Sequence, residues 1–144
     1  MIIVAIDETN FNKASEILDH LDSQKCMIKI GSVTFNSIGK EIISYAYKRE
    51  FDIFLDLKLH DIPNTVKKSI EGISSLPIKM LTIHISGGME MMRAAMEAVS
   101  GTDIKIFGVT VLTSLSDDDT SNIFQRNTSE QVSEMLDLAE SAGI

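Results

Sequence analysis

Five short apolar runs recur along this chain, and each carries a polar residue at or near its C-terminal end, before an amphipathic segment begins. The polar residues are Asp7, Lys29, Asp56, His84 and Thr113, at successive spacings of 22, 27, 28 and 29 residues. Such runs predict buried strands of a parallel sheet, with the amphipathic segments as helices on its face. A βα unit of this period is typical of a (β/α)-barrel, whose functional residues gather at the C-terminal ends of the strands.

The hydrophobic patterns also place the individual elements. Strands are expected at residues 2–6, 27–30, 80–84 and 104–112, and the stretch 51–65 is expected to start as a strand and end as a loop. Helices are expected at residues 11–21, 35–46, 63–73, 89–99 and 129–142, with a short helix inside the polar segment 116–128. The turn Ser86-Gly87-Gly88 is expected to be a tight βα turn, with an anion-binding nest as the alternative reading. A doubly wound sheet competes with the barrel, but it favours a glycine-rich loop after the first strand, where this chain has Asp7-Glu8-Thr9-Asn10.

The chain length conflicts with a whole barrel. Eight βα units typically need about 250 residues, whereas this chain has 144 residues and five units. We therefore expect residues 1–144 to form one incomplete (β/α)8 domain that lacks the C-terminal strands. We expect the chain to be a fragment or a broken gene product that is inactive or barely active by itself.

Composition excludes several classes of protein. The formal net charge of −8 argues against nucleic-acid binding, which needs a basic surface. No apolar stretch approaches the roughly 20 residues of a membrane helix, and the N-terminal run has no basic region of a signal peptide. The single cysteine, Cys26, is expected to be a buried hydrophobic residue in a reducing compartment. These features predict a soluble cytoplasmic protein.

The third strand carries two charges inside an apolar run. In a regular strand Phe54, Asp56 and Lys58 share one face, and the leucines and Ile53 share the other. Charges are costly to bury unless they are paired, so these two need partners. A surface salt pair on an edge strand is the simple explanation. In a barrel, Lys29 would converge with them near the mouth, with Asp61 on the loop above. Each carboxylate would then keep its neighbouring lysine protonated, ready to donate a proton to a developing carbanion.

The run Asp56-Leu-Lys-Leu-His-Asp-Ile-Pro-Asn-Thr65 resembles the signature of the orotidine 5'-phosphate decarboxylase family, which makes UMP in pyrimidine biosynthesis. The flanking motifs agree in order. Val4–Asp7 and Lys29–Gly31 resemble the first two strand ends of the family, and Ile83–Gly88 and Val109–Ser114 resemble the fourth and fifth. The similarity covers essentially all 144 residues.

The resemblance implies a role for each matching residue. Lys58 would donate the proton to C6 of the pyrimidine, with Asp56 beside the departing carboxylate. Lys29 would bind ribose and complete a Lys-Asp-Lys-Asp array with Asp61, and Asp61 and Thr65 would reach into the partner's site of a homodimer. No metal or organic cofactor is implied. The implied substrate contacts are Asp7, Lys29, Asp56, Leu57, Lys58, Leu59, His60, Asp61, Ile62, Pro63, Asn64, Thr65, Thr113 and Ser114.

Two other functions stay open. A keto-gulonate phosphate decarboxylase type of barrel resembles this chain in its Asp-x-Lys-x-x-Asp core but uses magnesium, and the continuation Ile62–Thr65 favours the first family. A non-catalytic half-barrel that only self-associates or pairs with another chain is the third reading. The glutamine and arginine that grip the phosphate in the resembled family lie beyond its fifth strand, and no counterpart of them is found here.

Overall fold

The structure is a computed structural model that describes residues 2–144. These residues form two compact units, and each is described by itself. The first unit comprises residues 2–57, Gly72–Leu81 and Gly101–Lys105, and the second comprises Lys58–Glu71, Thr82–Ser100 and Ile106–Ile144.

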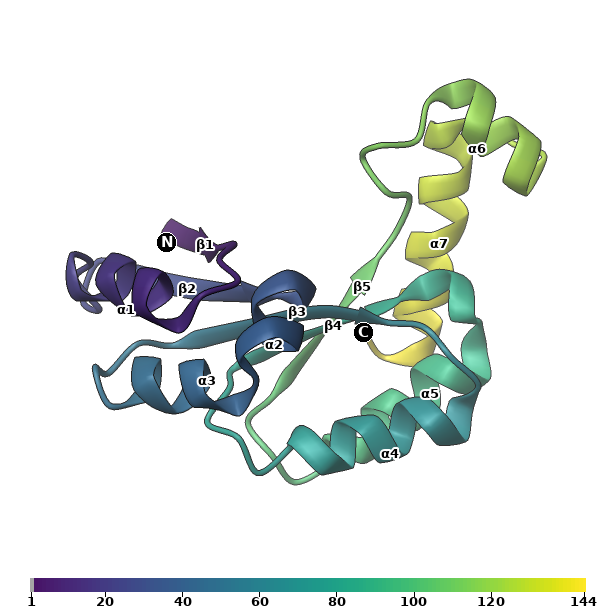
Figure 1. The fold of residues 1–144 in the computed structure, drawn as a ribbon. Coiled ribbons are helices and arrows are strands. Elements are labelled where there is room, and N and C mark those ends of the chain that lie inside the picture. The colour runs from purple at the N-terminus through teal and green to yellow at the C-terminus, as the bar shows by residue number, and fades with distance from the viewer. Residues whose placement is uncertain (1) are drawn as a thin grey trace. The chain divides into compact units, whose positions relative to one another are not determined.

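Strands and helices alternate along the described residues, as the sequence predicts (Figure 1). In chain order they are β1 (Ile2–Ile6), α1 (Phe11–Asp19), β2 (Cys26–Gly31), α2 (Ser32–Ile38), α3 (Lys40–Tyr47), β3 (Ile53–Leu59), α4 (Pro63–Ile73), β4 (Met80–His84), the 3-10 turn η1 (Ile85–Gly87), α5 (Met89–Ala98), β5 (Lys105–Val109), α6 (Asp117–Phe124) and α7 (Thr128–Ala142). The strands form one sheet in the order β1-β2-β3-β4-β5. Neighbours in sequence are therefore neighbours in the sheet, which is the order of a βα barrel.

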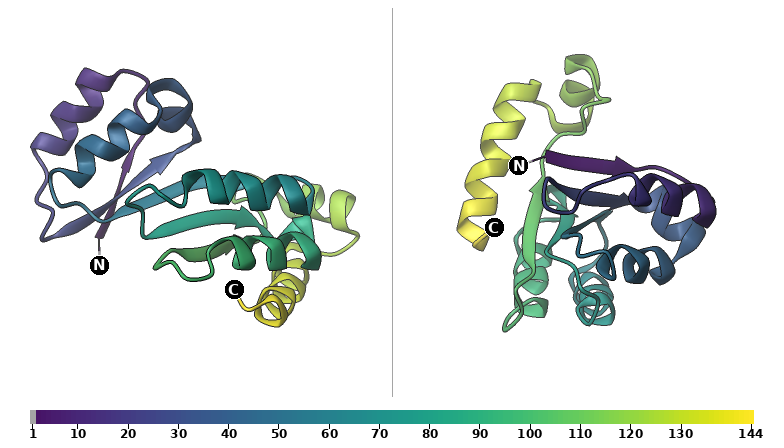
Figure 2. Two further views of the ribbon diagram at one scale, coloured as in Figure 1. Left: turned by 90° about the horizontal axis from the view of Figure 1, so that it is seen from below. Right: turned by 90° about the vertical axis from the view of Figure 1, so that its left-hand side faces the viewer.

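Parallel pairing fixes which residues face each other in the first unit. β1 and β2 run side by side in one direction (Figure 2), with Ile6 opposite Ile30. β2 pairs with β3 in the same sense, with Gly31 opposite Asp56. Parallel neighbours need a crossover connection, and the helices between these strands supply it. The C-terminal ends of the three strands therefore lie at one edge of the sheet.

The core of the first unit follows from the apolar runs. β2 and β3 bury aliphatic side chains, and α1 and α3 each bury one apolar stripe at helical spacing. The buried apolar residues of this unit include Ile6, Ala14, Leu18, Ile28, Ile30, Ile42, Ile43, Ala46, Ile53 and Leu55. Fully burying one such aliphatic side chain contributes roughly 1.5–3 kcal/mol, so this core holds the strand ends in register.

The prediction of one helix over residues 35–46 was wrong. The segment forms two helices, α2 and α3, which meet at Gly39. Gly39 has φ 78° and ψ −154°, a conformation that a residue with a Cβ rarely adopts. The apolar spacing continues across this glycine, and for that reason the pattern alone concealed the break.

The second unit contains the C-terminal parts of β3, β4 and β5 with α5, α6 and α7. Its core gathers Met91, Met92 and Ala95 of α5 with Met135 and Ala139 of α7, all buried. Residues Ile85–Gly87 form a 3-10 turn, and Gly88 then begins α5 with φ 85°. The expected tight βα turn is confirmed.

The end of β5 and the burial of Cys26 differ from the predictions. β5 ends at Val109, although the apolar pattern continues to Leu112. The polar segment does hold a short helix, α6, whose N-cap Ser116 and third residue Asp119 bond reciprocally in a capping box. Cys26 is half-buried rather than buried, and its thiol lies 3.4 Å from the carbonyl oxygen of Asp22.

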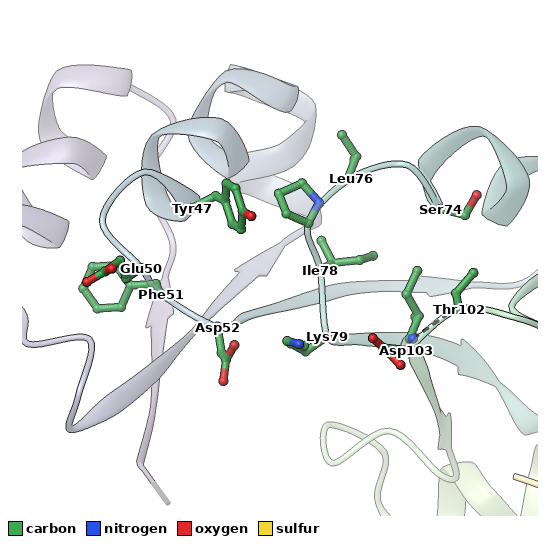
Figure 3. A pocket seen from close by; sticks show the side chains of 12 residues that line it. Tyr47, Glu50, Phe51, Asp52, Ser74, Leu76, Ile78, Lys79, Thr102 and Asp103 are labelled. Carbon is green, nitrogen blue, oxygen red and sulfur yellow. Dashed lines mark hydrogen bonds between the residues drawn. The ribbon is translucent and has the colours of Figure 1, made fainter.

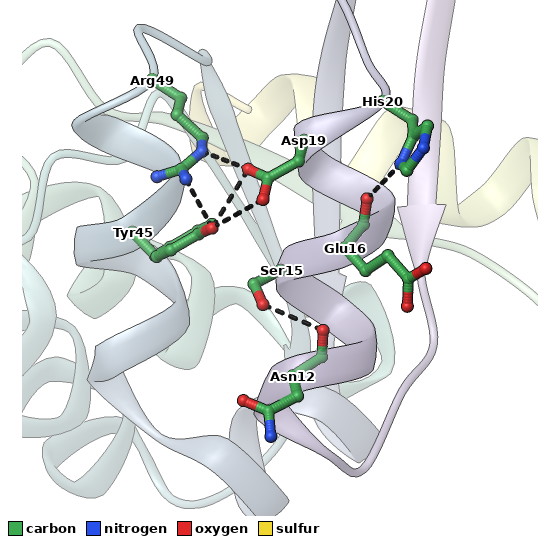
Figure 4. Close-up of polar contacts among 7 residues, drawn as sticks. All are labelled: Asn12, Ser15, Glu16, Asp19, His20, Tyr45 and Arg49. Atoms are coloured by element: carbon green, nitrogen blue, oxygen red, sulfur yellow. Dashed lines mark hydrogen bonds and ion pairs between the residues drawn. The ribbon is translucent and has the colours of Figure 1, made fainter.

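A polar cluster joins α1 to α3 on the surface of the first unit (Figure 4). Arg49 Nε donates to Asp19 Oδ1 at 2.6 Å, and the Tyr45 hydroxyl lies 3.0 Å from both carboxylate oxygens of Asp19. The Arg49 guanidinium also lies 3.5 Å from the centre of the Tyr45 ring. Partial desolvation raises the pKa of Asp19, but the hydrogen bonds from Arg49 and Tyr45 outweigh it and hold that pKa below its ordinary value of 3.8.

Replacing Asp19 by asparagine should therefore lower stability at neutral pH and matter less in acid. A carboxyl whose pKa is depressed on folding stabilises the fold above its unfolded pKa, and that contribution disappears as the pH falls through the folded pKa. Thermal unfolding of Asp19→Asn and wild type, measured at pH 7 and near pH 2.5, should show a gap that closes at the lower pH. Asp137→Asn, on the exposed face of α7, is the matched control. A gap that is the same at both pH values would contradict this assignment.

Candidate functional site

An ion pair joins β2 to β3, and its carboxylate, Asp56, is opposite Gly31, the last residue of β2. Lys29 Nζ lies 3.2 Å from Asp56 Oδ2, and the two side chains are 27% and 9% exposed. Lys29 is opposite Phe54 in the parallel register, and Phe54 and Asp56 share a face of β3, so the two charges lie on the same face. The pair supplies the partner that a buried carboxylate requires. It also confirms the contact between Lys29 and Asp56 that the sequence predicts.

Asp7 follows β1 at the same edge of the first unit. The Asp7 carboxylate lies next to Gly31, since a Cβ added to this glycine would lie 3.6 Å from Asp7 Oδ1. Gly31 is in turn the register partner of Asp56 on β3. The fully buried Thr34 fixes the backbone on both sides of Asp7. Its hydroxyl donates to the Ile6 carbonyl at 2.6 Å and accepts from the Glu8 N–H at 3.0 Å. Asp7, Lys29 and Asp56 are thus held at one edge of the sheet.

Lys58 belongs to the second unit and departs from regular strand geometry. Its φ is +50°, in the left-handed region, although it lies within β3. The regular alternation predicted through Lys58 and Leu59 therefore does not hold at this residue, because alternation requires extended backbone. The Lys58 N–H donates to Thr82 Oγ1 at 2.8 Å, and Thr82 is only 4% exposed. The Lys58 side chain is half-buried.

The loop between β3 and α4 places the rest of the signature around an open hollow. His60, Asp61, Ile62 and Pro63 line this hollow of about 470 Å³, with Ser86 and Gly87 from the turn after β4. Asp61 is exposed, and its Oδ1 accepts from the Ile62 N–H at 2.7 Å. The His60 ring lies 5.2 Å from that of His84. Asn64 and Thr65 are exposed in the first turn of α4.

The remaining predicted contacts, Thr113 and Ser114, lie on the segment between β5 and α6, and both are exposed. Leu57 and Leu59 are half-buried on β3. Ile62 is 66% exposed.

Sequence reasoning missed two buried threonines. Thr34 bonds to the backbone on both sides of Asp7 in the first unit, and Thr82 bonds to the backbone of Lys58 in the second. One signal could have found Thr82, since it interrupts the apolar run Met80–Ile83 and a buried hydroxyl needs a partner. Thr34 lies in a polar stretch and gives no such signal.

A cavity of about 590 Å³ lies at the other end of the strands in the first unit (Figure 3). It is lined by the loops that precede β3, β4 and β5, among them Tyr47, Phe51, Leu76 and Asp103. Barrel enzymes carry their chemistry at the C-terminal ends of the strands, and conservation at the opposite end serves stability. Size alone therefore does not make this cavity the candidate site.

Residues 2–144 contain neither a membrane-spanning helix nor a metal-binding cluster. No helix there is long and apolar enough to cross a membrane. No group of three or more histidine, cysteine, aspartate or glutamate side chains there could hold a metal ion.

The sequence model of the "Orotidine 5'-phosphate decarboxylase / HUMPS family" matches residues 1–144. The chain belongs to this family. Its curated relatives include the orotidine 5'-phosphate decarboxylases of Saccharophagus degradans, 40% identical over 98% of this chain, and Shewanella sediminis, 41% identical over 99%. The aligned parts cover 60% and 63% of those two proteins, so the chain spans about three fifths of their length.

Solved structures of the family share the fold. The crystal structure of orotidine 5'-phosphate decarboxylase from Lactobacillus acidophilus superposes with a TM-score of 0.90 at 33% identity, covering 98% of this chain and 67% of that one. An uncharacterized conserved protein from Geobacillus kaustophilus gives the same TM-score at 29% identity, covering 100% and 71%. The α/β barrel class predicted from the sequence is confirmed, with five βα units of the barrel present in these 144 residues.

Proposed function

We propose that this chain carries the proton-transfer machinery of an orotidine 5'-phosphate decarboxylase, a carboxy-lyase that makes UMP for pyrimidine biosynthesis. The observation that carries the proposal is the Lys29–Asp56 ion pair at 3.2 Å. It lies at the strand ends where barrel enzymes hold their active sites, and Asp56 begins the signature that the sequence shares with the family. The names of the curated relatives favour this activity over the magnesium-dependent alternative.

The proposed reaction breaks the bond between C6 of the pyrimidine and its carboxylate. Carbon dioxide leaves, and the electron pair of that bond stays on C6. Lys58 Nζ then gives its proton to C6, which forms the new C–H bond, and water restores the proton on the lysine. General acid catalysis of this kind contributes typically 10²–10⁴-fold.

The neighbouring charges have distinct proposed roles. The Asp56 carboxylate, whose side chain is 9% exposed, pairs with the Lys29 ammonium 3.2 Å away and offsets its charge. The ammonium groups of Lys29 and Lys58 are the fixed positive charges that stabilise the developing carbanion in this proposal, without reorganising during the reaction. Lys29 and Asp7 bind the ribose hydroxyls, and Thr113 and Ser114 contact the base. The residues of the loop after β3 complete the substrate-binding surface.

We further propose a homodimer in which Asp61 and Thr65 act in the partner's site. Both are exposed, and the neighbouring Ile62 side chain is 66% exposed beside the same hollow. An apolar residue in that state is suited to an interface. Sedimentation velocity should show a dimer that Ile62→Glu disrupts, and a wild-type monomer at assay concentration would contradict the proposed dimer.

A reducing cytoplasm is the proposed compartment, since the chain has a single cysteine. Cell fractionation with an antibody against the chain would check this location.

The activity test compares two polypeptides. The first is residues 1–144, and the second joins them to the C-terminal part of the Saccharophagus degradans enzyme that lies beyond the aligned segment. We expect the joined chain to form UMP from orotidine 5'-phosphate and the 144-residue chain to turn over far more slowly. The reason is that binding energy from a remote phosphate is used to assemble the transition-state site.

Each outcome of this comparison discriminates between functions. Turnover by the joined chain in the presence of EDTA supports the proposal, whereas a requirement for magnesium supports the keto-gulonate phosphate decarboxylase type. If the joined chain showed no turnover while the parent Saccharophagus degradans enzyme was active in the same assay, the proposed decarboxylase function would be refuted. If residues 1–144 form a stable oligomer that does not bind UMP, and the joined chain is inactive, the non-catalytic reading holds.

A further inference from the structure

Lys58 has a backbone conformation that its position does not explain. Three non-glycine residues among residues 2–144 have positive φ: Glu50, Lys58 and Gln125. Gln125 is the C-cap of α6, and Glu50 follows α3, so both lie where chains commonly turn left-handed to leave a helix. Lys58 lies within β3 instead, at φ +50°. A side-chain-bearing residue is disfavoured there and persists only where its surroundings hold it.

The contact that holds Lys58 comes from the neighbouring strand. Thr82 stands in the middle of β4 and is 4% exposed, and its Oγ1 accepts the Lys58 N–H at 2.8 Å. A threonine has a stiff χ1, because two heavy atoms crowd its Cβ. Its hydroxyl oxygen is therefore a fixed point in the core of the second unit. A buried N–H needs such an acceptor, and the Thr82 hydroxyl fixes the position of the amide group from which the Lys58 backbone turns left-handed.

We infer that Thr82 is a positioning residue for Lys58. Its hydroxyl holds the Lys58 backbone in the left-handed conformation, and this conformation sets the direction in which the lysine side chain leaves the strand. The inference rests on the proposed function, in which Lys58 Nζ delivers the proton to C6. Thr82 touches the backbone of Lys58 and acts through it, so its effect should fall on the chemical step more than on binding.

The decisive variants separate the hydroxyl from the packing. Thr82→Val keeps the branched shape and removes the acceptor, whereas Thr82→Ser keeps the acceptor. Thr120→Val is the matched control, because Thr120 is also fully buried with a bonded hydroxyl but lies in α6. In the joined chain we expect kcat of Thr82→Val to fall about 100-fold, the cost of a misplacement near 1 Å, with KM little changed. Thr82→Ser should recover most of the rate, and Thr120→Val should keep it.

A spectroscopic readout tests the contact without any turnover. The ¹⁵N–¹H signal of the Lys58 amide, assigned in the folded 144-residue chain, should move strongly in Thr82→Val and stay near its wild-type position in Thr82→Ser. If Thr82→Val does not fold, Thr82→Cys, a weaker acceptor of similar size, should give an intermediate rate and shift. Turnover of Thr82→Val equal to that of Thr120→Val would overturn the positioning role, as would an unmoved Lys58 amide. If Lys58→Ala itself kept full turnover, the proposed function would fail while the amide shift still tested the contact.

Discussion

Replacing Lys58 by alanine should reduce the rate of UMP formation about 10²–10⁴-fold, the range of a lost general acid. The ammonium is the proposed proton source, and alanine leaves C6 without a donor at that position. The Lys58 side chain is only half-buried, so its removal should leave the protein folded. Initial rates in the joined chain, with circular dichroism and UMP affinity as folding checks, measure the effect.

The control for this change is a lysine with the same charge outside the site. Lys68→Ala, on the exposed face of α4, alters the net charge equally and should keep wild-type turnover. If Lys58→Ala and Lys68→Ala turned over alike, the proton would have to come from another group. Loss of turnover together with loss of folding in Lys58→Ala would assign the lysine a structural role instead.

Replacing Asp56 by asparagine should affect both stability and rate. The variant leaves the Lys29 ammonium, 27% exposed, without the carboxylate 3.2 Å away. Breaking a buried pair costs about 3–5 kcal/mol and an exposed pair about 0–1 kcal/mol, so a loss of about 2 kcal/mol is expected for this partly buried pair. The rate should fall about 10²–10³-fold, as it does when a preorganised charge-stabilising group is removed.

A double-mutant cycle isolates the pair. Urea unfolding of Asp56→Asn, Lys29→Met and the double variant should give a double loss clearly smaller than the sum of the single losses. Glu97→Gln, which breaks the Lys67–Glu97 pair between α4 and α5, is the control and should cost much less, since the Glu97 side chain is 66% exposed. Additive losses at Lys29 and Asp56 would show that the two charges do not stabilise each other.

The sequence predicted most of this fold for identifiable reasons. Pro63 marked the start of α4, because proline fits the first helical turn, and α4 does run from Pro63 to Ile73. The apolar period located β4 to the residue. The same period ran through Gly39 and concealed the break between α2 and α3. An apolar pattern records which side chains face a core, and a single glycine that redirects the backbone leaves that pattern intact.

The candidate site was predicted only where charges carried the signal. Asp56 and Lys58 stood out because ionic side chains in an apolar strand require partners, and in the structure Asp56 pairs with Lys29. The φ of Lys58 and the hydroxyl that holds it belong to the backbone, and side-chain alternation assumes an extended backbone throughout. Thr34 was invisible for a similar reason, since its two hydrogen bonds go to main-chain groups 26 and 28 residues away.

The hydrogen bonds of Thr34 hold only the C-terminal end of β1, and the N-terminal end of the strand is exposed. Ile2 and Ile3 at its start are 63% and 42% exposed, whereas Ile6 at its finish is fully buried and its carbonyl is held by the Thr34 hydroxyl. Local opening draws on segments with few buried contacts, so we expect β1 to open first at Ile2 and Ile3. Asp7 follows Ile6, the end of β1 that Thr34 holds. We therefore expect the start of β1 to open without displacing the Asp7 carboxylate.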